Sequence, residues 1–308
     1  MTSASAPGKI ILFGEHAVVY GQPALAIPVT QVHANVEVET SSQVGIWLDA
    51  PDIGLHAELN SLPAENPLAA VIRNLFFALH IDPFPNLAIR VSSTIPVASG
   101  LGSGASVSVA MIRALSSFLG KSLTDEQVNQ LCFEIEKLHH GTPSGIDNTV
   151  VTYAKPVYFV RGHSIETFTV GRPFSIVIGD TGIPAPTKES VADVRQLWEA
   201  DQSKWEKVFN EVGSIAKNAR ERIEKGDWQG LGELMDQNHV LLQKMTVSSP
   251  DLDRLVAAAK RTGALGAKLS GGGRGGNMIA LATPDSSDII SAALKEAGAH
   301  RIILTTVQ

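Results

Sequence analysis

The sequence predicts an α+β fold built as two lobes. Its 308 residues exceed the length of one average domain. Short apolar or alternating segments fill the first half, whereas the stretch from Thr187 to Met245 is rich in Glu, Lys, Arg and Gln. Strands that precede a group of solvated helices are typical of α+β proteins. We place the boundary between Phe159 and Phe174, which gives domains over residues 1–165 and 166–308.

The first lobe is predicted to begin with strands, because its segments alternate or are apolar over short lengths. These strands cover residues 9–14, 24–28, 32–40, 44–48, 55–59 and 87–94. Asn66 and Pro67 fit the cap and first position of a helix that runs to about His80. A second helix covers about 105–119, and a Thr-x-x-Gln capping box at Thr124 starts a third.

The remaining chain is predicted to change from strands to long helices and back. Strands cover residues 148–153, 157–160, 166–170 and 174–179. Helices cover about 189–224 and 228–245, and another starts at Pro250 with Ser249 as its cap. A glycine cluster between two strands follows, and the second of these strands covers 278–282. A helix at 287–297 and a strand at 301–307 complete the chain.

Composition disfavours several classes of protein. Hydrophobic residues make up 44% of the chain and the formal net charge is −6, which argues against a disordered chain and against a nucleic-acid-binding protein. Cys132 is the single cysteine, so a reducing compartment fits. Residues 1–9 lack a signal-peptide pattern, and no apolar run approaches the ~20 residues of a membrane span. We therefore expect a soluble, cytoplasmic protein without nucleic-acid or membrane partners.

Glycine-rich runs carry the first functional signals. The run Gly-Leu-Gly-Ser-Gly-Ala at residues 100–105 follows a strand and opens a helix, where free N–H groups and the helix dipole suit a phosphate. A tight strand-to-helix turn is the alternative. The run at residues 271–276 matches G-x-G-x-x-G, but a strand follows it, which disfavours a Rossmann dinucleotide site. Its five glycines favour a backbone that closely wraps something, with a flexible turn as the alternative.

Two carboxylates flank a third run, His-Gly-Thr-Pro-Ser-Gly at residues 140–145. Glu136 precedes the run near a helix end, and Asp147 follows it. Mg²⁺ prefers carboxylate and phosphate oxygens, and a phosphoryl acceptor needs a base near its hydroxyl. Glu136 and Asp147 could divide these two roles. The alternatives are a solvated helix residue and a turn cap.

Four segments together resemble the GHMP small-molecule kinases. They are PGKIILFGEHAVVYGQPALA (7–26), PVASGLGSGASVSVA (96–110), HGTPSGIDN (140–148) and KLSGGGRGGN (268–277). The forms GEHAVVYG and HGTPSGIDN are most similar to those of the mevalonate kinases within that family. The resemblance implies a two-lobed GHMP kinase fold, with a ribosomal protein S5-like N-terminal domain and a ferredoxin-like and helical C-terminal domain.

The resemblance also implies roles for individual residues. Lys9 and Asp147 match catalytic residues, the lysine beside the acceptor hydroxyl and the aspartate as its base. Glu136 and Ser103 are the expected Mg²⁺ ligands. The expected acceptor contacts are Lys9, Glu15, His16, Asp147 and Thr187, and the expected ATP contacts are Pro96, Gly100, Leu101, Gly102, Ser103, Gly104 and Ala105.

The implied reaction is ATP- and Mg²⁺-dependent phosphorylation of the 5-hydroxyl of mevalonate, in the formation of isoprenoid precursors. The residues leave open a related GHMP kinase that acts on phosphomevalonate or a sugar, and a catalytically silent sensor of the same fold. The family resemblance also makes a homodimer an expectation.

Two positions depart from the family pattern. Gly104 stands where the form GLGSSA has its metal-associated serine, so Ser103, Ser106 or a water must substitute. Arg274 interrupts a run that usually reads GAGGGG. Its side chain either adds positive charge near the phosphates or points into solvent.

Overall fold

The computed structural model describes residues 1–96, 99–140, 143–164 and 166–308. Two compact units share these residues, and each is built from separate stretches of chain. The first unit contains Met1–Lys9, Pro28–Val97 and Gly102–Ala154, and the second contains Ile10–Ile27, Ala98–Leu101 and Lys155–Gln308. Helices and strands occur in both units, which confirms the α+β class. A domain boundary between residues 165 and 166 stays a prediction.

The first unit contains a mixed sheet in the order β4-β3-β5-β2. β2 (Ala24–Thr40) pairs antiparallel with β5 (Leu87–Ser93), β5 pairs parallel with β3 (Ile46–Ala50), and β3 pairs antiparallel with β4 (Leu55–Glu58). β1 (Thr2–Phe13) also pairs with β2. Alternate residues at the start of β5 are buried, as its alternating sequence predicts.

Residues 24–28 and 32–40, predicted as two strands, form the single strand β2. Its residues 24–26 pair with β6 (Val157–Phe159), and its residues 34–40 pair with β5. Pro28 lies between these two paired segments. It has no backbone N–H to donate, and neither pairing needs one at this position. The predicted break was therefore wrong, because this proline sits where the pairing partner changes.

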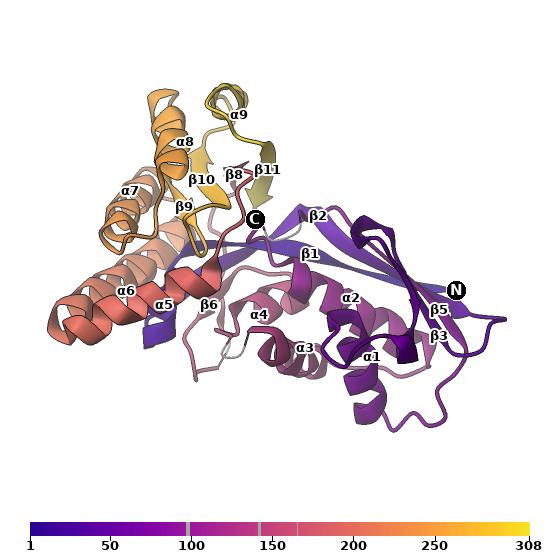
Figure 1. Cartoon of the computed structure of the whole chain (residues 1–308). Helices are drawn as coiled ribbons and strands as arrows, with labels where there is room; N and C mark the ends of the chain where they lie inside the picture. The colour runs from indigo at the N-terminus through magenta and orange to yellow at the C-terminus, as the bar shows by residue number, and fades with distance from the viewer. Residues whose placement is uncertain (97–98, 141–142, 165) are drawn as a thin grey trace. The chain divides into compact units, whose positions relative to one another are not determined.

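Helices of the first unit cover one face of its sheet (Figure 1). They are α1 (Pro67–Ala78), α2 (Ser103–Phe118), α3 (Asp125–His140) and α4 (Ile146–Tyr153). Two of them begin at predicted caps. Asn66 Oδ1 accepts the N–H of Leu68 at 3.0 Å, and the side chains of Thr124 and Gln127 each accept the other's N–H, which confirms the capping box.

Residues 148–153, predicted as a strand, belong to α4. Their β-branched side chains favour a strand locally, but α4 packs against α2 and α3 instead of joining a sheet. Asn148 Nδ2 donates to Asn129 Oδ1 on α3 at 2.7 Å, in a buried contact that a strand would not make. Tertiary packing thus overrides local propensity. One consequence is that Asp147 lies in the first turn of a helix.

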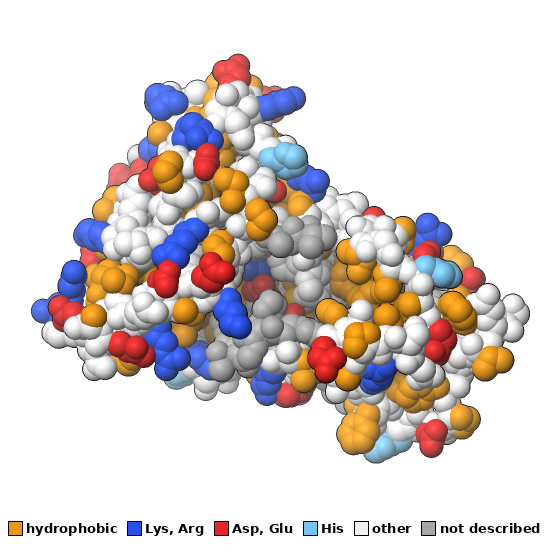
Figure 2. All heavy atoms as spheres, viewed as in Figure 1, with side chains coloured by type: hydrophobic (Ala, Val, Ile, Leu, Met, Phe, Trp, Pro, Cys, Tyr) orange, Lys and Arg blue, Asp and Glu red, His pale blue; other side chains and the backbone are white. Residues whose placement is uncertain are grey.

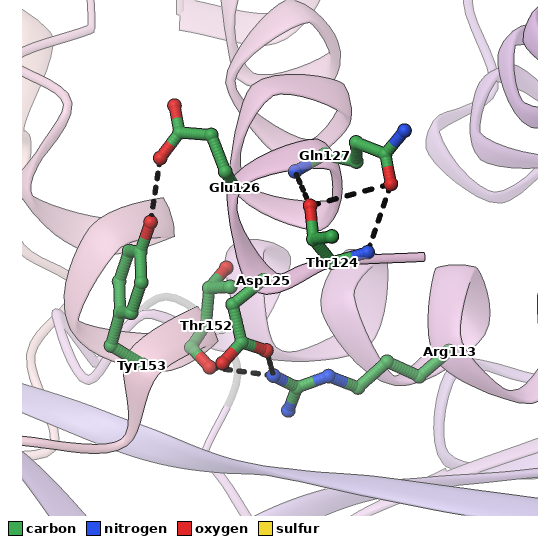
Figure 3. A network of polar contacts seen from close by, with 7 residues as sticks. All are labelled: Arg113, Thr124, Asp125, Glu126, Gln127, Thr152 and Tyr153. Atoms are coloured by element: carbon green, nitrogen blue, oxygen red, sulfur yellow. Dashed lines mark hydrogen bonds and ion pairs between the residues drawn. The ribbon is translucent and has the colours of Figure 1, made fainter. Parts of the chain in front are cut away.

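A polar network joins α2 to the start of α3 and to the end of α4 (Figure 3). Arg113 Nη2 on α2 donates to Asp125 Oδ1 at the start of α3 at 2.7 Å, and to the carbonyl of Thr152 on α4 at 2.6 Å. The Tyr153 hydroxyl donates to Glu126 at 2.7 Å. Burial and this carboxylate raise the pKa of Tyr153 to about 12. The network therefore fixes α2, α3 and α4 relative to one another.

Arg113→Ala is expected to lower the free energy of unfolding by about 1–2 kcal/mol, because it removes a charged donor from a carboxylate and a helix-end carbonyl. Urea denaturation measures the change. Lys137→Ala is the control, since its pair with Glu134 is exposed and should contribute less than ~0.5 kcal/mol. Equal effects of the two substitutions would contradict the proposed fastening role.

The second unit contains a four-stranded antiparallel sheet within its described residues. The strand order is β11-β8-β10-β9. The bounds are β8 (Phe174–Asp180), β9 (Gly266–Ser270), β10 (Asn277–Ala282) and β11 (Arg301–Val307). The sheet packs with α7 (Trp228–Lys244), α8 (Pro250–Arg261) and α9 (Ser287–Glu296) (Figure 1). Every residue of β9 and β10 is buried, so these strands form the core of the unit.

The single helix predicted over residues 189–224 is in fact two helices, α5 (Thr187–Ala200) and α6 (Gln202–Lys225). Asp201 interrupts them with φ −155°, and its carboxylate accepts the N–H of Lys204 at 3.1 Å. Aspartate favours such a cap over a helix interior. Figure 2 shows basic and acidic side chains interspersed over these helices, as the mixed charges predict.

Two further findings concern the remaining segments. The strand predicted over residues 166–170 shortens to β7 (Glu166–Thr167), which pairs with β6. Within the ranges that the structure describes, no helix is both long and apolar enough to cross a membrane.

Candidate functional site

The first unit places the run at residues 102–105 across the start of α2. Gly102 has φ 74° and precedes the helix, and Ser103 is its first residue. The first N–H groups of a helix have no partner within it, and the dipole makes this end attractive to an anion. Gly100 and Leu101 group with the second unit. Residues 97–98 and 141–142, within two of the sequence motifs, lie outside the described residues.

Lys9 and Asp147 meet within the first unit. Lys9 Nζ on β1 lies 2.9 Å from Asp147 Oδ1 on α4, with side-chain exposures of 5% and 34%. The buried lysine is thus paired, while the carboxylate keeps an accessible edge. Gly102 makes this approach possible, since a Cβ on it would lie 2.8 Å from Lys9 Cγ. Glycine at this position therefore has two roles: it leaves space for the Lys9 side chain, and it adopts the positive φ of the turn.

Glu136, near the end of α3, is buried in the same unit. Burial raises its pKa to about 7; the charge of Asp147 adds to the rise and that of Lys9 opposes it. A Cβ on Gly104 would lie 3.5 Å from Glu136 Oε1, so the position that lacks the expected serine faces this carboxylate. Lys9, Glu136 and Asp147 therefore interact electrostatically beside the start of α2.

The serines offered as substitutes at this position differ in availability. The Ser106 hydroxyl is fully buried and donates to main-chain carbonyls, with Pro7 O at 2.6 Å and Gly102 O at 2.8 Å. Ser103 is half-buried at the helix start. Ser106 is therefore a structural residue, which leaves Ser103 or a water as the alternatives. Among the described residues, no group of three or more His, Cys, Asp or Glu could by itself hold a metal ion.

The second unit contains a buried ion pair that the sequence reasoning missed. Lys268 Nζ on β9 contacts Glu15 Oε1, and both side chains have 0% exposure. Asn238 Nδ2 on α7 donates to the other carboxylate oxygen at 3.1 Å, and Lys268 also donates to Leu269 O at 2.6 Å. Burial raises the pKa of Glu15 and lowers that of Lys268, while their mutual attraction opposes both shifts. An apolar strand that contains one lysine was the available signal.

His16 follows this glutamate with an unusual backbone. Its φ is 60°, and its ring is buried. Nε2 lies 3.2 Å from Gly272 O and must donate to it, because a carbonyl only accepts. Burial lowers the pKa of His16 to about 4, so the ring is neutral at pH 7. Nδ1 is therefore an acceptor, and among the described residues no group donates to it.

The glycine-rich run at residues 271–276 wraps the protein's own backbone. A Cβ on Gly272 would lie 2.5 Å from Thr187 Oγ1, one on Gly273 would lie 1.9 Å from Val247 O, and one on Gly275 would lie 2.6 Å from Ile183 O. These glycines are required because the run fits between the segment that leads into α5 and the turn after α7. What the run wraps is thus, at these three positions, the chain itself.

Arg274, within this run, has a protein partner. Its Nη1 lies 2.5 Å from Asp193 Oδ2 on α5, and its side chain is 29% exposed. Neither of the two alternatives for this side chain included the ion pair, because the sequence could not show that α5 brings a carboxylate to the run. Thr187 is the exposed first residue of the same helix.

Comparisons with known proteins agree with these features. The models of the GHMP kinases N-terminal and C-terminal domains match residues 66–155 and 219–300. A mevalonate kinase of Thermococcus sibiricus is 37% identical, covering 97% of this chain and 94% of its own length. One from Methanocaldococcus jannaschii is 32% identical, with coverage of 89% and 90%.

Solved structures give the same result. The L. major mevalonate kinase in complex with R-mevalonate matches with a TM-score of 0.87 and 32% identity, covering 100% of this chain and 96% of the other. A Streptococcus pneumoniae phosphomevalonate kinase has a TM-score of 0.86 but 18% identity over the whole of both chains, which shows the fold alone. From its two matched domains and these near full-length relatives, the chain belongs to the GHMP kinases.

Proposed function

We propose that this chain transfers the γ-phosphoryl group of ATP to the 5-hydroxyl of mevalonate. The observation that carries the proposal is the ion pair of Lys9 and Asp147 beside Glu136 and the start of α2. Support for mevalonate as the acceptor comes from relatives named mevalonate kinase, which are up to 37% identical over nearly the full chain. A cytoplasmic location and a homodimer stay predictions.

ATP phosphates would bind at the first turn of α2. Main-chain N–H groups of Ser103, Gly104 and Ala105 have no helical partner at this position, so they can donate to phosphate oxygens. The rest of the loop, with Pro96, Gly100, Leu101 and Gly102, would let the backbone approach the nucleotide closely. A neutral, glycine-rich helix start thus holds the donor by its phosphates.

Asp147 would accept the proton of the acceptor hydroxyl. Its carboxylate is fixed by Lys9 on one side and retains 34% exposure on the other, where a hydroxyl can approach. The Lys9 ammonium would stabilise the negative charge that develops on the acceptor oxygen. Phosphoryl transfer demands positioning and charge stabilisation more than covalent participation, which is what this pair provides.

Mg²⁺ fits the donors of the first unit. Glu136 and Ser103 offer hard oxygen atoms, and Mg²⁺ takes one or two carboxylates together with phosphate oxygens and water. The buried Glu136 beside the Asp147 charge is an arrangement that a cation would stabilise. These two residues would hold the ion, which when bound neutralises charge on the β- and γ-phosphates.

His16 and Thr187 would contact the acceptor from the second unit. Because Nδ1 of His16 is a buried acceptor on a neutral ring, it suits a ligand hydroxyl better than a carboxylate. Glu15 would act indirectly, since its carboxylate is fully used by Lys268 and Asn238 and holds the loop that carries His16. An alcohol-bearing acceptor is therefore consistent with the unpartnered nitrogen.

The titration of Glu136 gives a prediction for the metal-free protein. The pKa of Glu136 is about 7 in the folded state, against an ordinary value of 4.5, so between these two pH values the folded state holds a proton that the unfolded state has lost. Wild-type stability should thus fall by about 3 kcal/mol, relative to Glu136→Gln, as the pH rises from 4.5 through 7. Urea denaturation of both proteins from pH 4.5 to 8 tests this, and parallel curves would contradict it.

The proposed reaction is tested by ADP release with a panel of acceptors. Mevalonate should support turnover, whereas phosphomevalonate, galactose and homoserine should support little. Preference for another member of the panel would reassign the acceptor but keep the kinase. ATP binding without turnover on any acceptor would favour the catalytically silent sensor.

A further inference from the structure

Gly272 is the point where the two acceptor-side residues of the second unit meet. Its carbonyl accepts the hydrogen bond from His16 Nε2 at 3.2 Å. Its Cα faces Thr187, since a Cβ there would lie 2.5 Å from Thr187 Oγ1. The glycine-rich run thus sets the distance between the loop that carries His16 and the first turn of α5.

The run is joined to its surroundings on both sides by main-chain hydrogen bonds. The N–H of Gly276 donates to Ile183 O at 2.7 Å, and the N–H of Arg274 donates to Val247 O at 2.8 Å. The first bond joins the run to the segment before α5, and the second joins it to the turn after α7. Neither bond reaches α5 itself.

Arg274 adds a polar connection to α5, beyond the close approach of Gly272 to Thr187. Its Nη1 pairs with Asp193 on α5 at 2.5 Å, and its Nε donates to Thr246 O at 3.2 Å. The backbone of Arg274 has φ 60°, a conformation that disfavours residues other than glycine. A residue with this side chain is therefore present despite a backbone cost, which indicates that its contacts matter.

α5 has few buried residues, although its Trp198 also packs on Tyr20, with ring centroids 5.5 Å apart. Of its 14 residues, only Ser190 and Val194 are buried. Asp193 precedes Val194, the buried apolar residue of α5, in the sequence. The ion pair therefore acts on the part of α5 that also makes its apolar contact. An arginine fork that reaches two acceptors fixes a helix more firmly than one point charge does.

We propose that the Arg274–Asp193 ion pair positions the acceptor side of the site, by holding α5 and Thr187 against the glycine-rich run that also holds His16. The inference rests on the proposed kinase function. Neither residue needs to touch the acceptor, so both are positioning residues. The pair should therefore determine the KM for mevalonate, and leave the KM for ATP and kcat nearly unchanged.

A double-mutant cycle tests the proposal. Arg274→Gln and Asp193→Asn neutralise each partner with little change of shape. Each single variant should raise the KM for mevalonate about fivefold, and the double variant should raise it no more than either single one. The control is the exposed Arg195–Glu199 pair of the same helix, at 3.2 Å, whose neutralisation should leave KM within about twofold.

A charge reversal makes the test independent of simple loss of contacts. Arg274→Glu alone should raise the KM for mevalonate more than Arg274→Gln does, and the added Asp193→Arg should restore most of it. Thermal unfolding of every variant checks that it is folded. Two results would overturn the proposal. One is a double variant in which the fold-increases in KM of the two neutralising substitutions multiply, and the other is an equal increase in the KM for both substrates.

Failure of the proposed function would appear differently. The wild-type protein would then give no turnover with mevalonate before any variant is made. The cycle would be run on whichever panel acceptor the wild type phosphorylates, where the same coupling is expected. Wild-type turnover with uncoupled variants would overturn the positioning role alone.

Discussion

Replacement of Asp147 by asparagine is expected to lower kcat for mevalonate phosphorylation by about 10²–10⁴, the usual contribution of a general base. The amide keeps the size of the side chain but cannot take the hydroxyl proton. ATP binding should stay near that of the wild type, since the phosphate contacts that we propose lie on the α2 main chain. Steady-state kinetics and calorimetric titration with a non-hydrolysable ATP analogue measure the two quantities.

Glu134→Gln is the matched control for this substitution. It removes an exposed carboxylate of the same unit, two positions before Glu136, that accepts hydrogen bonds from the exposed side chains of Lys137 and Gln130. Its kcat should stay within about twofold of the wild type, as expected for a surface charge. A near-normal kcat for Asp147→Asn would reject Asp147 as the base and leave the Lys9 pair with a structural role.

Local sequence signals predicted much of the fold. Asn66, Thr124 and Ser249 each cap a helix through a side-chain oxygen, and these contacts lie within a few residues of the cap. The last strand, Arg301–Val307, has the predicted bounds. Features determined by neighbours in sequence were thus accessible before the structure.

Errors arose where distant contacts decide the outcome. The strand predicted over residues 148–153 is the helix α4, because helices α2 and α3 enclose it. The glycine-rich run at 271–276 was expected to wrap something closely, but its sequence did not show that at several positions this is the protein's own chain. No spacing rule shows which segment of a chain will lie against another.

The residues of the candidate site show the same difference between local sequence signals and distant contacts. Lys9, Glu136 and Asp147 were found through motifs, and the structure brings the lysine and aspartate within 2.9 Å. Lys268 was missed, because its partner Glu15 lies 253 positions away in the sequence. Motifs identify residues that touch ligands more readily than those that hold them in place.

Lys268→Met is expected to be the most destabilising substitution, at about 3–5 kcal/mol. It leaves the Glu15 carboxylate at 0% exposure without its counter-charge, with Asn238 as a remaining donor. Urea denaturation measures the loss. The control is Lys260→Met, whose pair with Asp236 at 2.6 Å is partly exposed and should contribute less than ~1 kcal/mol.

The double variant Glu15→Gln with Lys268→Met distinguishes two causes of instability. One is the loss of the attraction between Glu15 and Lys268, and the other is the buried Glu15 charge that is left without a counter-charge. The double variant should recover much of the stability, because a neutral amide removes the buried charge that the single variant leaves behind. Since burial already raises the pKa of Glu15, the single variant should regain stability at low pH, where this carboxyl takes up a proton. A loss independent of pH and unrelieved by Glu15→Gln would mean that Lys268 acts through packing, and that the loop carrying His16 is held by something other than charge.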